Sequence, residues 1–331
     1  MIRPTDAPTD FGLPEAPVDS PKAIRRLVVV SLGAALIAGV LYVVTVGTRT
    51  GQLVSELILG GRPVSAEAAA AAEGVLRILS RSTLAAGILL ILGVAMVQRR
   101  PRLAIVAMAA VVGANVSSQV LKTVVLDRSD LLDGLFYPLP NSFPSGHATA
   151  AASIAVGLLL VLPPLLRAPS VLLSAVVVAI VGASTLAAGW HRMADAMGGV
   201  FVATAWGAGL AAWLAWKRGV EVVGRRTAQF GHLSSALPML LGTAVVLVGV
   251  LAYVLIAADP LEVLLHLAER RGSPALFWVG ILVTIGTSLF ALGALGFALR
   301  DIQLDPRSRE EAAKIGHGAA PVPDTPLEEQ S

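Results

Sequence analysis

The stretch LVVVSLGAALIAGVLYVVTVG, residues 27–47, contains 21 residues and no Asp, Glu, Lys or Arg. As a helix rising about 1.5 Å per residue, it can cross the roughly 30 Å hydrocarbon layer of a membrane. Seven further charge-free stretches follow along the chain: 82–98, 103–121, 148–166, 171–190, 196–216, 233–258 and 274–299. The sequence therefore predicts an all-α, polytopic membrane protein with eight spans.

The overall composition agrees with a membrane protein. Of the 331 residues, 55% are hydrophobic and 14% are charged, and the mean hydropathy is +0.76. A soluble domain carries about a quarter charged residues. The chain has no cysteine, so it has neither a disulfide framework nor thiolate chemistry. Its net charge of +3 is assigned to loops near anionic headgroups, and no nucleic-acid partner is expected.

The apolar stretches and the composition around them divide the chain into four regions. Residues 1–21 and 302–331 lack hydrophobic periodicity and are predicted to be flexible cytoplasmic tails. Residues 22–217 hold the first six spans, and residues 218–301 hold a linker and two further spans. A leader of 26 residues precedes the first apolar stretch, so this stretch is predicted to be an anchor and not a cleaved signal peptide.

The Lys and Arg residues indicate how the chain is oriented. With the N-terminus inside, the inner segments carry 16 of them and the outer segments carry 9. Both termini are therefore predicted to be cytoplasmic, in the cell (inner) membrane of a bacterium. The longest outer segment, 48–81, is predicted to contain a helix capped by Ser65 and a stretch, Gly51–Leu59, that lies along the interface.

Three polar clusters lie at predicted ends of spans, where burial of polar groups is costly without a purpose. Lys122 and Arg128 follow the third span in LKTVVLDRSD. The sequence PSGH, residues 144–147, opens the fourth span, and His191 and Asp195 lie between the fifth and sixth. Strict alternation of the spans puts all three clusters on the outer face, although the spans were placed without reference to them.

Two of these clusters are suited to binding a phosphate group. Ser145 and Gly146 open a helix, where free backbone N–H groups and the positive end of the helix dipole attract an anion. Lys122 and Arg128 can hold phosphate oxygens, Arg with a planar fork and Lys as a point charge. Taken alone, these two cations could equally be headgroup anchors. Their position on the same face as the helix start favours a phosphate site.

The histidines supply the reactive groups. His191 and Asp195 are four residues apart and share a helix face, so the carboxylate can hold one imidazole nitrogen while the other attacks. His147 then carries the proton that a departing oxygen needs. A single histidine at a helix end is more often an interfacial residue, and a His–Asp pair at this spacing is often a local hydrogen bond. The combination of the clusters therefore indicates chemistry, whereas none of them does so alone.

PSGH, followed about 40 residues later by H-x-x-x-D, resembles motifs two and three of the type 2 phosphatidic acid phosphatase (PAP2) and vanadium haloperoxidase superfamily. The resemblance implies a six-helix core over residues 22–217, with the last two spans appended. It implies a metal-independent and cofactor-independent phosphatase that acts on a lipid phosphate or polyprenyl diphosphate within the bilayer; the oligomeric state is not indicated. His191 would be the nucleophile that forms a phosphohistidine, Asp195 would orient it, and His147 would be the general acid. Phosphate would be bound by Lys122, Arg128, Ser145 and Gly146.

The sequence departs from the family pattern in two places. Motif one is usually K-x6-R-P, whereas Lys122 and Arg128 are separated by five residues and no proline follows. Motif three usually begins with Ser-Arg six residues before its histidine, and here that pair is Ser184 and Thr185. One phosphate-binding arginine is therefore missing. We predict that Arg192, beside the nucleophile, supplies this charge from another direction. The alternative is that Arg192 anchors a helix end to lipid headgroups.

Two other functions fit parts of the sequence. Asp130, Asp133 and Gly134 form D-x-x-D-G, the opening of the CDP-alcohol phosphotransferase signature, whose carboxylates would hold a divalent metal. The Ala-Arg that follows in that signature and its later D-x3-D pair are absent. The other alternative is a non-catalytic or transporting protein that binds a lipid phosphate. Its spans would be expected to carry charges along a transport path, and all eight stretches lack them.

Overall fold

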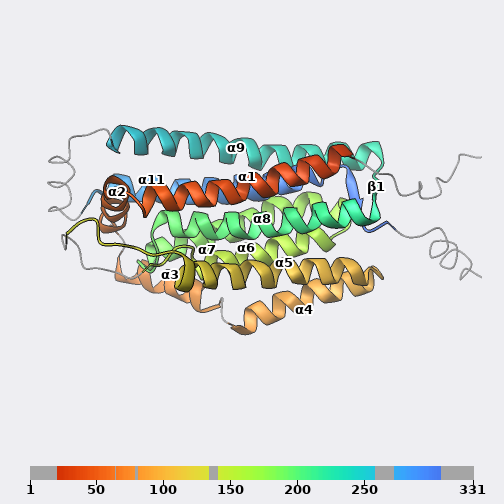
Figure 1. Cartoon of the computed structure of the whole chain (residues 1–331), viewed down its shortest axis with the longest axis horizontal. Helices are drawn as coiled ribbons and strands as arrows, with labels where there is room; N and C mark the ends of the chain where they lie inside the picture. Colours follow the sequence, from red (N-terminus) through yellow and green to blue (C-terminus); the bar gives the residue numbers. More distant parts are fainter. Residues whose placement is uncertain (1–20, 64, 79–80, 134–140, 258–271, 307–331) are drawn as a thin grey trace, which may run out of the picture.

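The computed structural model describes residues 21–63, 65–78, 81–133, 141–257 and 272–306, which form a bundle of long helices (Figure 1). The predicted all-α membrane fold is confirmed. Each of the eight predicted apolar stretches lies largely within one helix: α1 (Pro21–Thr45), α4 (Arg81–Val97), α5 (Pro101–Val120), α6 (Gly146–Val161), α7 (Pro164–Ala187), α8 (Met193–Arg218), α9 (Arg225–Ala257) and α11 (Pro274–Ala298).

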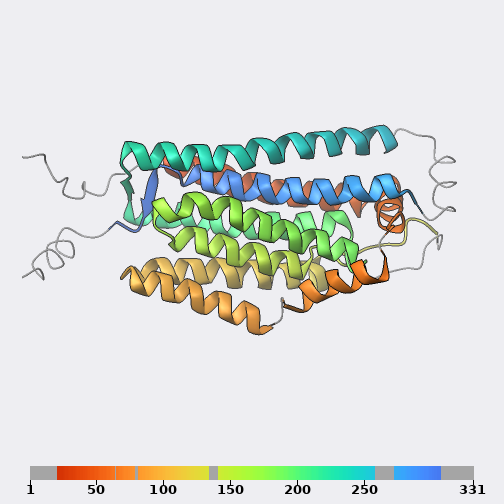
Figure 2. The ribbon, with the colours of Figure 1, turned by 180° about the vertical axis from the view of Figure 1, so that it is seen from behind.

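The outer faces of the bundle are apolar. On α1, the side chains of Val29, Leu32 and Leu36 are all more than 60% exposed, although they are hydrophobic. Six of the helices in the described residues are long and apolar enough to cross a membrane, and α6, with 16 residues, is shorter. Helix α3 (Ala66–Ile78) precedes α4 and is inclined to it (Figure 2). An apolar solvent accounts for such surfaces, because aliphatic side chains facing lipid lose nothing by exposure.

The boundary between α6 and α7 differs from the prediction. The charge-free stretches 148–166 and 171–190 placed Arg167 in an inner loop, but α7 begins at Pro164 and Arg167 lies inside it, 3% exposed. The prediction was wrong because a charge was taken to end a span. This guanidinium is stabilised within the protein by carbonyl oxygens. It donates to the backbone oxygens of Leu159, Leu162, Leu299 and Ile302.

A short two-stranded sheet joins the last two helices to the rest of the bundle. Strand β1 (Val220–Val222) pairs antiparallel with β2 (Ile302–Leu304), which is buried. The predicted tail 302–331 therefore starts too early, because Ile302 and Leu304 bury apolar side chains; residues 307–331 lie outside the described residues. Arg26 of α1 contacts Asp301 at 2.5 and 2.9 Å. The start of α1 and the end of α11 thus meet at one end of the bundle.

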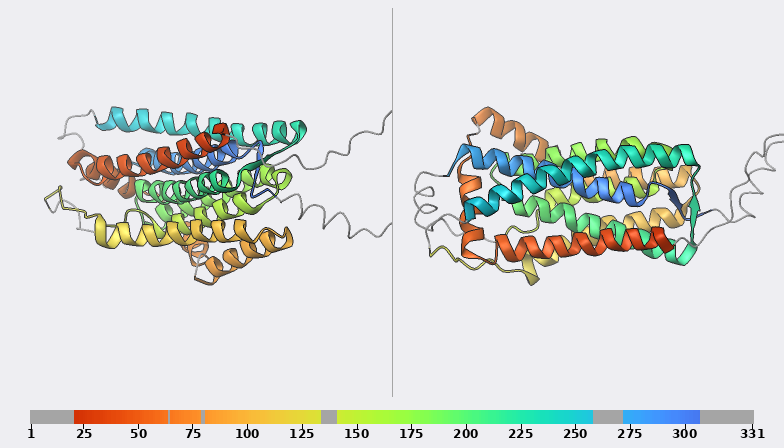
Figure 3. Two further views of the ribbon diagram at one scale, coloured as in Figure 1. Left: turned by 45° about the vertical axis from the view of Figure 1, so that its right-hand side comes forward. Right: turned by 90° about the horizontal axis from the view of Figure 1, so that it is seen from above.

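Helix α2 (Arg49–Gly60) lies across the opposite end, roughly perpendicular to the bundle (Figure 3). Its buried side chains include Leu53, Val54 and Leu57, and it contacts α1, α8, α9 and α11. The stretch predicted to lie along the interface therefore packs on protein and covers the ends of other helices. The predicted cap of the next helix is confirmed, since the Ser65 hydroxyl accepts a hydrogen bond from the Ala68 N–H at 3.2 Å.

The two ends of the bundle should be accessible from opposite sides of the membrane. Because the chain has no cysteine, Thr50→Cys on α2 and Lys217→Cys at the end of α8 each introduce a single thiol. From the charge asymmetry, an impermeant maleimide should label position 50 in intact cells and position 217 only after permeabilisation. The reverse pattern would contradict the orientation, and labelling of both positions from outside would contradict the placement of the ends.

Candidate active site

The first turn of α6 is fixed against the start of α8. The Ser145 side chain caps α6 by accepting from the Ala148 N–H, and the Ser145 N–H donates to the backbone oxygen of Asp195 at 2.8 Å. A Cβ at Gly199 would lie 2.7 Å from the Ser145 carbonyl oxygen, so only glycine allows the two helices to approach this closely. Helix α6 then begins at Gly146, and the N–H groups of its first turn have no acceptor within the helix.

Lys122 borders this helix start. It lies in η1 (Leu121–Val125), a π-helical turn that ends α5, and Asn141 holds this turn by donating to the Lys122 backbone oxygen at 3.3 Å. A Cβ built on Gly146 would lie 3.4 Å from Gln119 Nε2 and 3.9 Å from Lys122 Nζ. The glycine thus leaves a space bordered by an ammonium group, an amide and a helix N-terminus. These are the donors expected around a bound phosphate.

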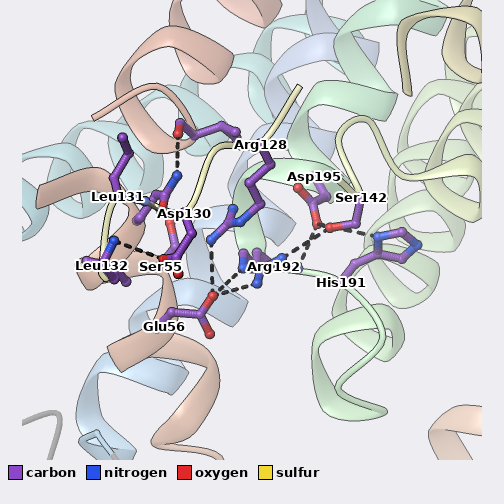
Figure 4. A network of polar contacts seen from close by, with 12 residues as sticks. Ser55, Glu56, Arg128, Asp130, Leu131, Leu132, Ser142, His191, Arg192 and Asp195 are labelled. Atoms are coloured by element: carbon purple, nitrogen blue, oxygen red, sulfur yellow. Dashed lines mark hydrogen bonds and ion pairs between the residues drawn. The ribbon is translucent and has the colours of Figure 1, made fainter. Parts of the chain in front are cut away.

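The Asp195 carboxylate connects the segment before α6 with the loop that carries His191 (Figure 4). Asp195 is 1% exposed, and its Oδ2 accepts from the Ser142 hydroxyl at 2.5 Å and from the Arg192 backbone N–H at 3.0 Å. The same oxygen lies 3.4 Å from His191 Nδ1, an ion-pair distance without hydrogen-bond alignment. Nδ1 therefore faces the carboxylate, which leaves Nε2 as the nitrogen that can meet a substrate.

His147 lies next to His191. Their ring centroids are 6.4 Å apart in a T-shaped arrangement, and the His147 ring is 5.5 Å from that of Trp190. One phosphoryl group that makes contacts of about 3 Å on each side can bridge two imidazoles at such a separation. The structure therefore brings together the two histidines that the sequence placed on one face.

Two arginines lie beside this cluster and share one partner, towards which both point in Figure 4. Glu56 of α2 accepts through Oε1 from Arg192 Nε at 2.7 Å and Nη2 at 2.5 Å, and from Arg128 Nη2 at 3.1 Å. The exposed fractions of the side chains are only 4% for Arg192, 7% for Arg128 and 11% for Glu56. Burial and the Arg192 cation lower the pKa of Arg128, and the Glu56 carboxylate opposes them.

Glu56, Ser142 and Asn141 are parts of this site that the sequence did not indicate. The available signal for Glu56 was that it is the single acidic residue of α2. Nothing in the spacing of that helix connects it with residues more than 70 positions later, so its partners could not be identified. Ser142 and Asn141 directly precede PSGH, and their nearness to that motif was the signal for them.

Arg192 has a more specific environment than the sequence suggested. Its burial rules out the alternative of an anchor for headgroups. Besides its two bonds to Glu56, its Nη1 donates to Ser142 Oγ at 3.3 Å. A guanidinium has five N–H groups, so donors remain beyond these three bonds. Binding of phosphate by Arg192 stays a prediction.

Thr185, which stands in the place of the missing family arginine, has a structural position. It is fully buried, and its hydroxyl donates to the Gly182 carbonyl oxygen at 2.7 Å. Its own carbonyl accepts from the N–H groups of Trp190 and His191 at 3.0 and 3.2 Å. Thr185 therefore shapes the loop that carries His191, and the positive charge near that loop comes from other residues.

The aspartates of the alternative metal motif do not converge. Asp133 is exposed and pairs with Arg49 at 3.4 Å, while Asp130 accepts from the backbone N–H of Leu132 at 3.0 Å. Gly134 lies outside the described residues. Across the described ranges, no group of three or more His, Asp or Glu residues is placed to hold a metal ion. The carboxylates of this loop are better explained as local surface contacts.

Residues 75–219 match the sequence profile of the PAP2 superfamily. No curated protein matches the chain. Among solved structures, the chain is similar to the first transmembrane PAP2 type phosphatidylglycerolphosphate phosphatase from Bacillus subtilis, at 20% identity and a TM-score of 0.46, over 56% of this chain and 96% of that chain.

The PAP2 segment contains every predicted site residue: Lys122, Arg128, Ser145, Gly146, His147, His191, Arg192 and Asp195. It starts within α3 and ends just after α8, so α1, α2, α9 and α11 lie outside the match. The predicted core starts earlier, at residue 22, and that boundary stays a prediction. The match of this segment to the PAP2 superfamily supports phosphatase chemistry in a multi-pass membrane protein.

Removal of the Arg192 side chain should reveal whether it replaces the missing arginine. Arg192→Ala should lower kcat about 100-fold or more, the usual effect of removing one transition-state donor. Arg192→Lys should recover only part of this loss, because the fork is absent. Arg49→Ala, an exposed arginine of the same end, is the matched control and should stay within about twofold of the unaltered protein. If Arg192→Ala has a near-normal kcat and unaltered thermal unfolding, Arg192 does not replace the missing arginine, and only Lys122 and Arg128 supply positive charge to the phosphoryl group.

Proposed function

We propose that the protein is a metal-independent phosphatase of lipid phosphates or polyprenyl diphosphates, with its active site on the outer face of a bacterial cell membrane. The observation that carries this proposal is the meeting of three separate segments at one end of the bundle. They place His191 against Asp195, His147 near His191, and Lys122 at the open start of α6. Each group has a function in phosphoryl transfer.

The reaction proceeds in two steps. His191 Nε2 attacks phosphorus, the bond between phosphorus and the lipid oxygen breaks, and that oxygen takes a proton from His147. Water then attacks the phosphohistidine. His147 accepts the proton of this water, the N–P bond breaks, and inorganic phosphate leaves. Asp195 orients the His191 ring and stabilises its positive charge throughout.

The cations of the site, Lys122 and Arg128, would stabilise the negative charge of the transferred phosphoryl group. In the transition state, negative charge is spread over three equatorial phosphoryl oxygens. Lys122, the Gly146 N–H at the start of α6 and the Arg128 guanidinium supply donors from different directions. The Ser145 hydroxyl lies at the same helix start, whereas the Ser145 N–H is already bonded to the Asp195 backbone oxygen. Because the donors are fixed before substrate arrives, little reorganisation is needed when this charge develops.

An apolar cavity next to the site favours a lipid substrate. It has a volume of about 490 Å³, lies between α1, α5 and α8, and is lined almost entirely by hydrophobic side chains. Leu126 and Phe143 line it, and Phe143 directly follows Ser142, which contacts Asp195. A lipid chain in this cavity would therefore bring its phosphate to the histidines. Both lipid phosphates and polyprenyl diphosphates have this form.

Phosphate release by detergent-purified protein tests the proposal. In EDTA, the protein should release inorganic phosphate from a panel of phosphatidic acid, phosphatidylglycerol phosphate and polyprenyl diphosphate, and vanadate should inhibit it. His191→Ala and His147→Ala should each lower kcat by about 1000-fold or more. His232→Ala, which alters a histidine of α9 whose ring lies 5.0 Å from that of Phe297, is the matched control.

Three results would count against this function. Absence of phosphate release from every lipid of the panel would favour a protein that binds lipid phosphate without cleaving it. Loss of activity in EDTA, with recovery on addition of magnesium, would favour carboxylate-held metal. An active His191→Ala enzyme would exclude the histidine nucleophile.

A further inference from the structure

Helix α2 is placed by contacts with the loop that carries Arg128. Gln52 donates to the backbone oxygens of Val46 and Ser129, both at 2.8 Å, and accepts from the Leu131 N–H at 3.3 Å. Gln52 and Glu56 are one helical turn apart and therefore lie on the same face of α2. Gln52 thus fixes α2 against the loop, and Glu56, one turn later, presents its carboxylate to Arg128.

Glu56 joins two cations that would otherwise repel each other. Arg128 and Arg192 both donate to a single oxygen of Glu56, so their guanidinium groups lie close together in an almost fully buried environment. Like charges this close interact strongly once water is excluded. The carboxylate compensates this repulsion and supplies charge-assisted hydrogen bonds that fix the direction of each fork.

This arrangement comes from outside the segment that matches the family. Residues 75–219 supply Arg128 and Arg192, whereas Glu56 lies before residue 75. Within that segment, Thr185 stands where a phosphate-binding arginine is usual. An arginine placed beside the nucleophile from a different direction needs a new partner to hold it, and Glu56 contacts both Arg192 Nε and Nη2.

We propose that Glu56 is a positioning residue, which holds Arg128 and Arg192 side by side so that their remaining N–H groups face the transferred phosphoryl group. The proposal rests on the phosphatase function inferred above. It assigns α2 a part in the site, in addition to covering the end of the bundle. The opposite possibility is that Glu56 occupies the place of phosphate and competes with it, and the two predict opposite changes in anion binding.

Binding of vanadate, which resembles the transition state, separates them without depending on turnover. Glu56→Gln keeps the shape of the side chain and removes its charge. Its vanadate dissociation constant should rise about tenfold or more, with a matching fall in kcat, because three charge-assisted hydrogen bonds lose their acceptor charge. Binding of inorganic phosphate should change by less than about threefold, because catalytic donors act mainly on the transition state. Glu67→Gln, an exposed glutamate of α3, is the matched control and should leave all three values unaltered.

A double variant provides a test that a merely structural role would not pass. If Glu56 acts through the arginines, the fold-loss of kcat caused by Glu56→Gln should be smaller once Arg192 is already Ala, because only Arg128 is then left for Glu56 to position. Equal effects of Glu56→Gln in both backgrounds, or vanadate binding within twofold of the unaltered protein, would overturn the proposal. Tighter vanadate and phosphate binding in Glu56→Gln would overturn it in favour of competition. If the unaltered protein binds vanadate but releases no phosphate, only the phosphatase function fails; if it binds no vanadate, both fail.

Discussion

Burial of the Asp195 carboxylate at the start of α8 constrains the rest of the site. A buried charge is costly unless its lone pairs are satisfied, and here one oxygen accepts from the Ser142 hydroxyl and the Arg192 backbone while facing His191. Those partners come from the segment before α6 and from the loop between α7 and α8. The need to satisfy a single carboxylate therefore fixes the segment that leads to Ser145 relative to His191. The hydrogen bond from the Ser145 N–H to the Asp195 backbone oxygen strengthens the same connection.

The positive side of the site depends on the same principle. Under the proposed function, Lys122, Arg128 and Arg192 bind an anion, and such a group of cations is unstable in an environment poor in water. Glu56 compensates part of this charge from α2, which itself is held by Gln52. At the other end of the bundle, Arg167 is compensated by backbone oxygens and no carboxylate is needed. Buried arginines thus organise both ends of the bundle. At one end backbone dipoles stabilise Arg167, and at the other the Glu56 carboxylate stabilises Arg128 and Arg192 beside the proposed active site.

Much of this could be predicted from the sequence, for a physical reason. A charge-free stretch in a membrane must satisfy its own backbone, so it must be helical, and alternation of helices then assigns polar clusters to one end. Predictions were wrong where a charge was taken as the end of a span, as at Arg167, and where apolar residues after the last span, Ile302 and Leu304, formed a strand. Glu56 was missed because its partners are distant in sequence, and no periodicity connects an acidic residue in an amphipathic helix with two arginines in other loops.

Trapping the covalent intermediate tests the central claim most directly. After rapid acid-free quenching of a reaction with a lipid phosphate labelled with ³²P on its terminal phosphoryl group, the account predicts a protein-bound label that is stable in alkali, labile in acid and located on His191. The same label should be absent from His191→Ala. A protein that turns over this substrate while carrying label on another residue, or with no label at any time during turnover, would contradict the account.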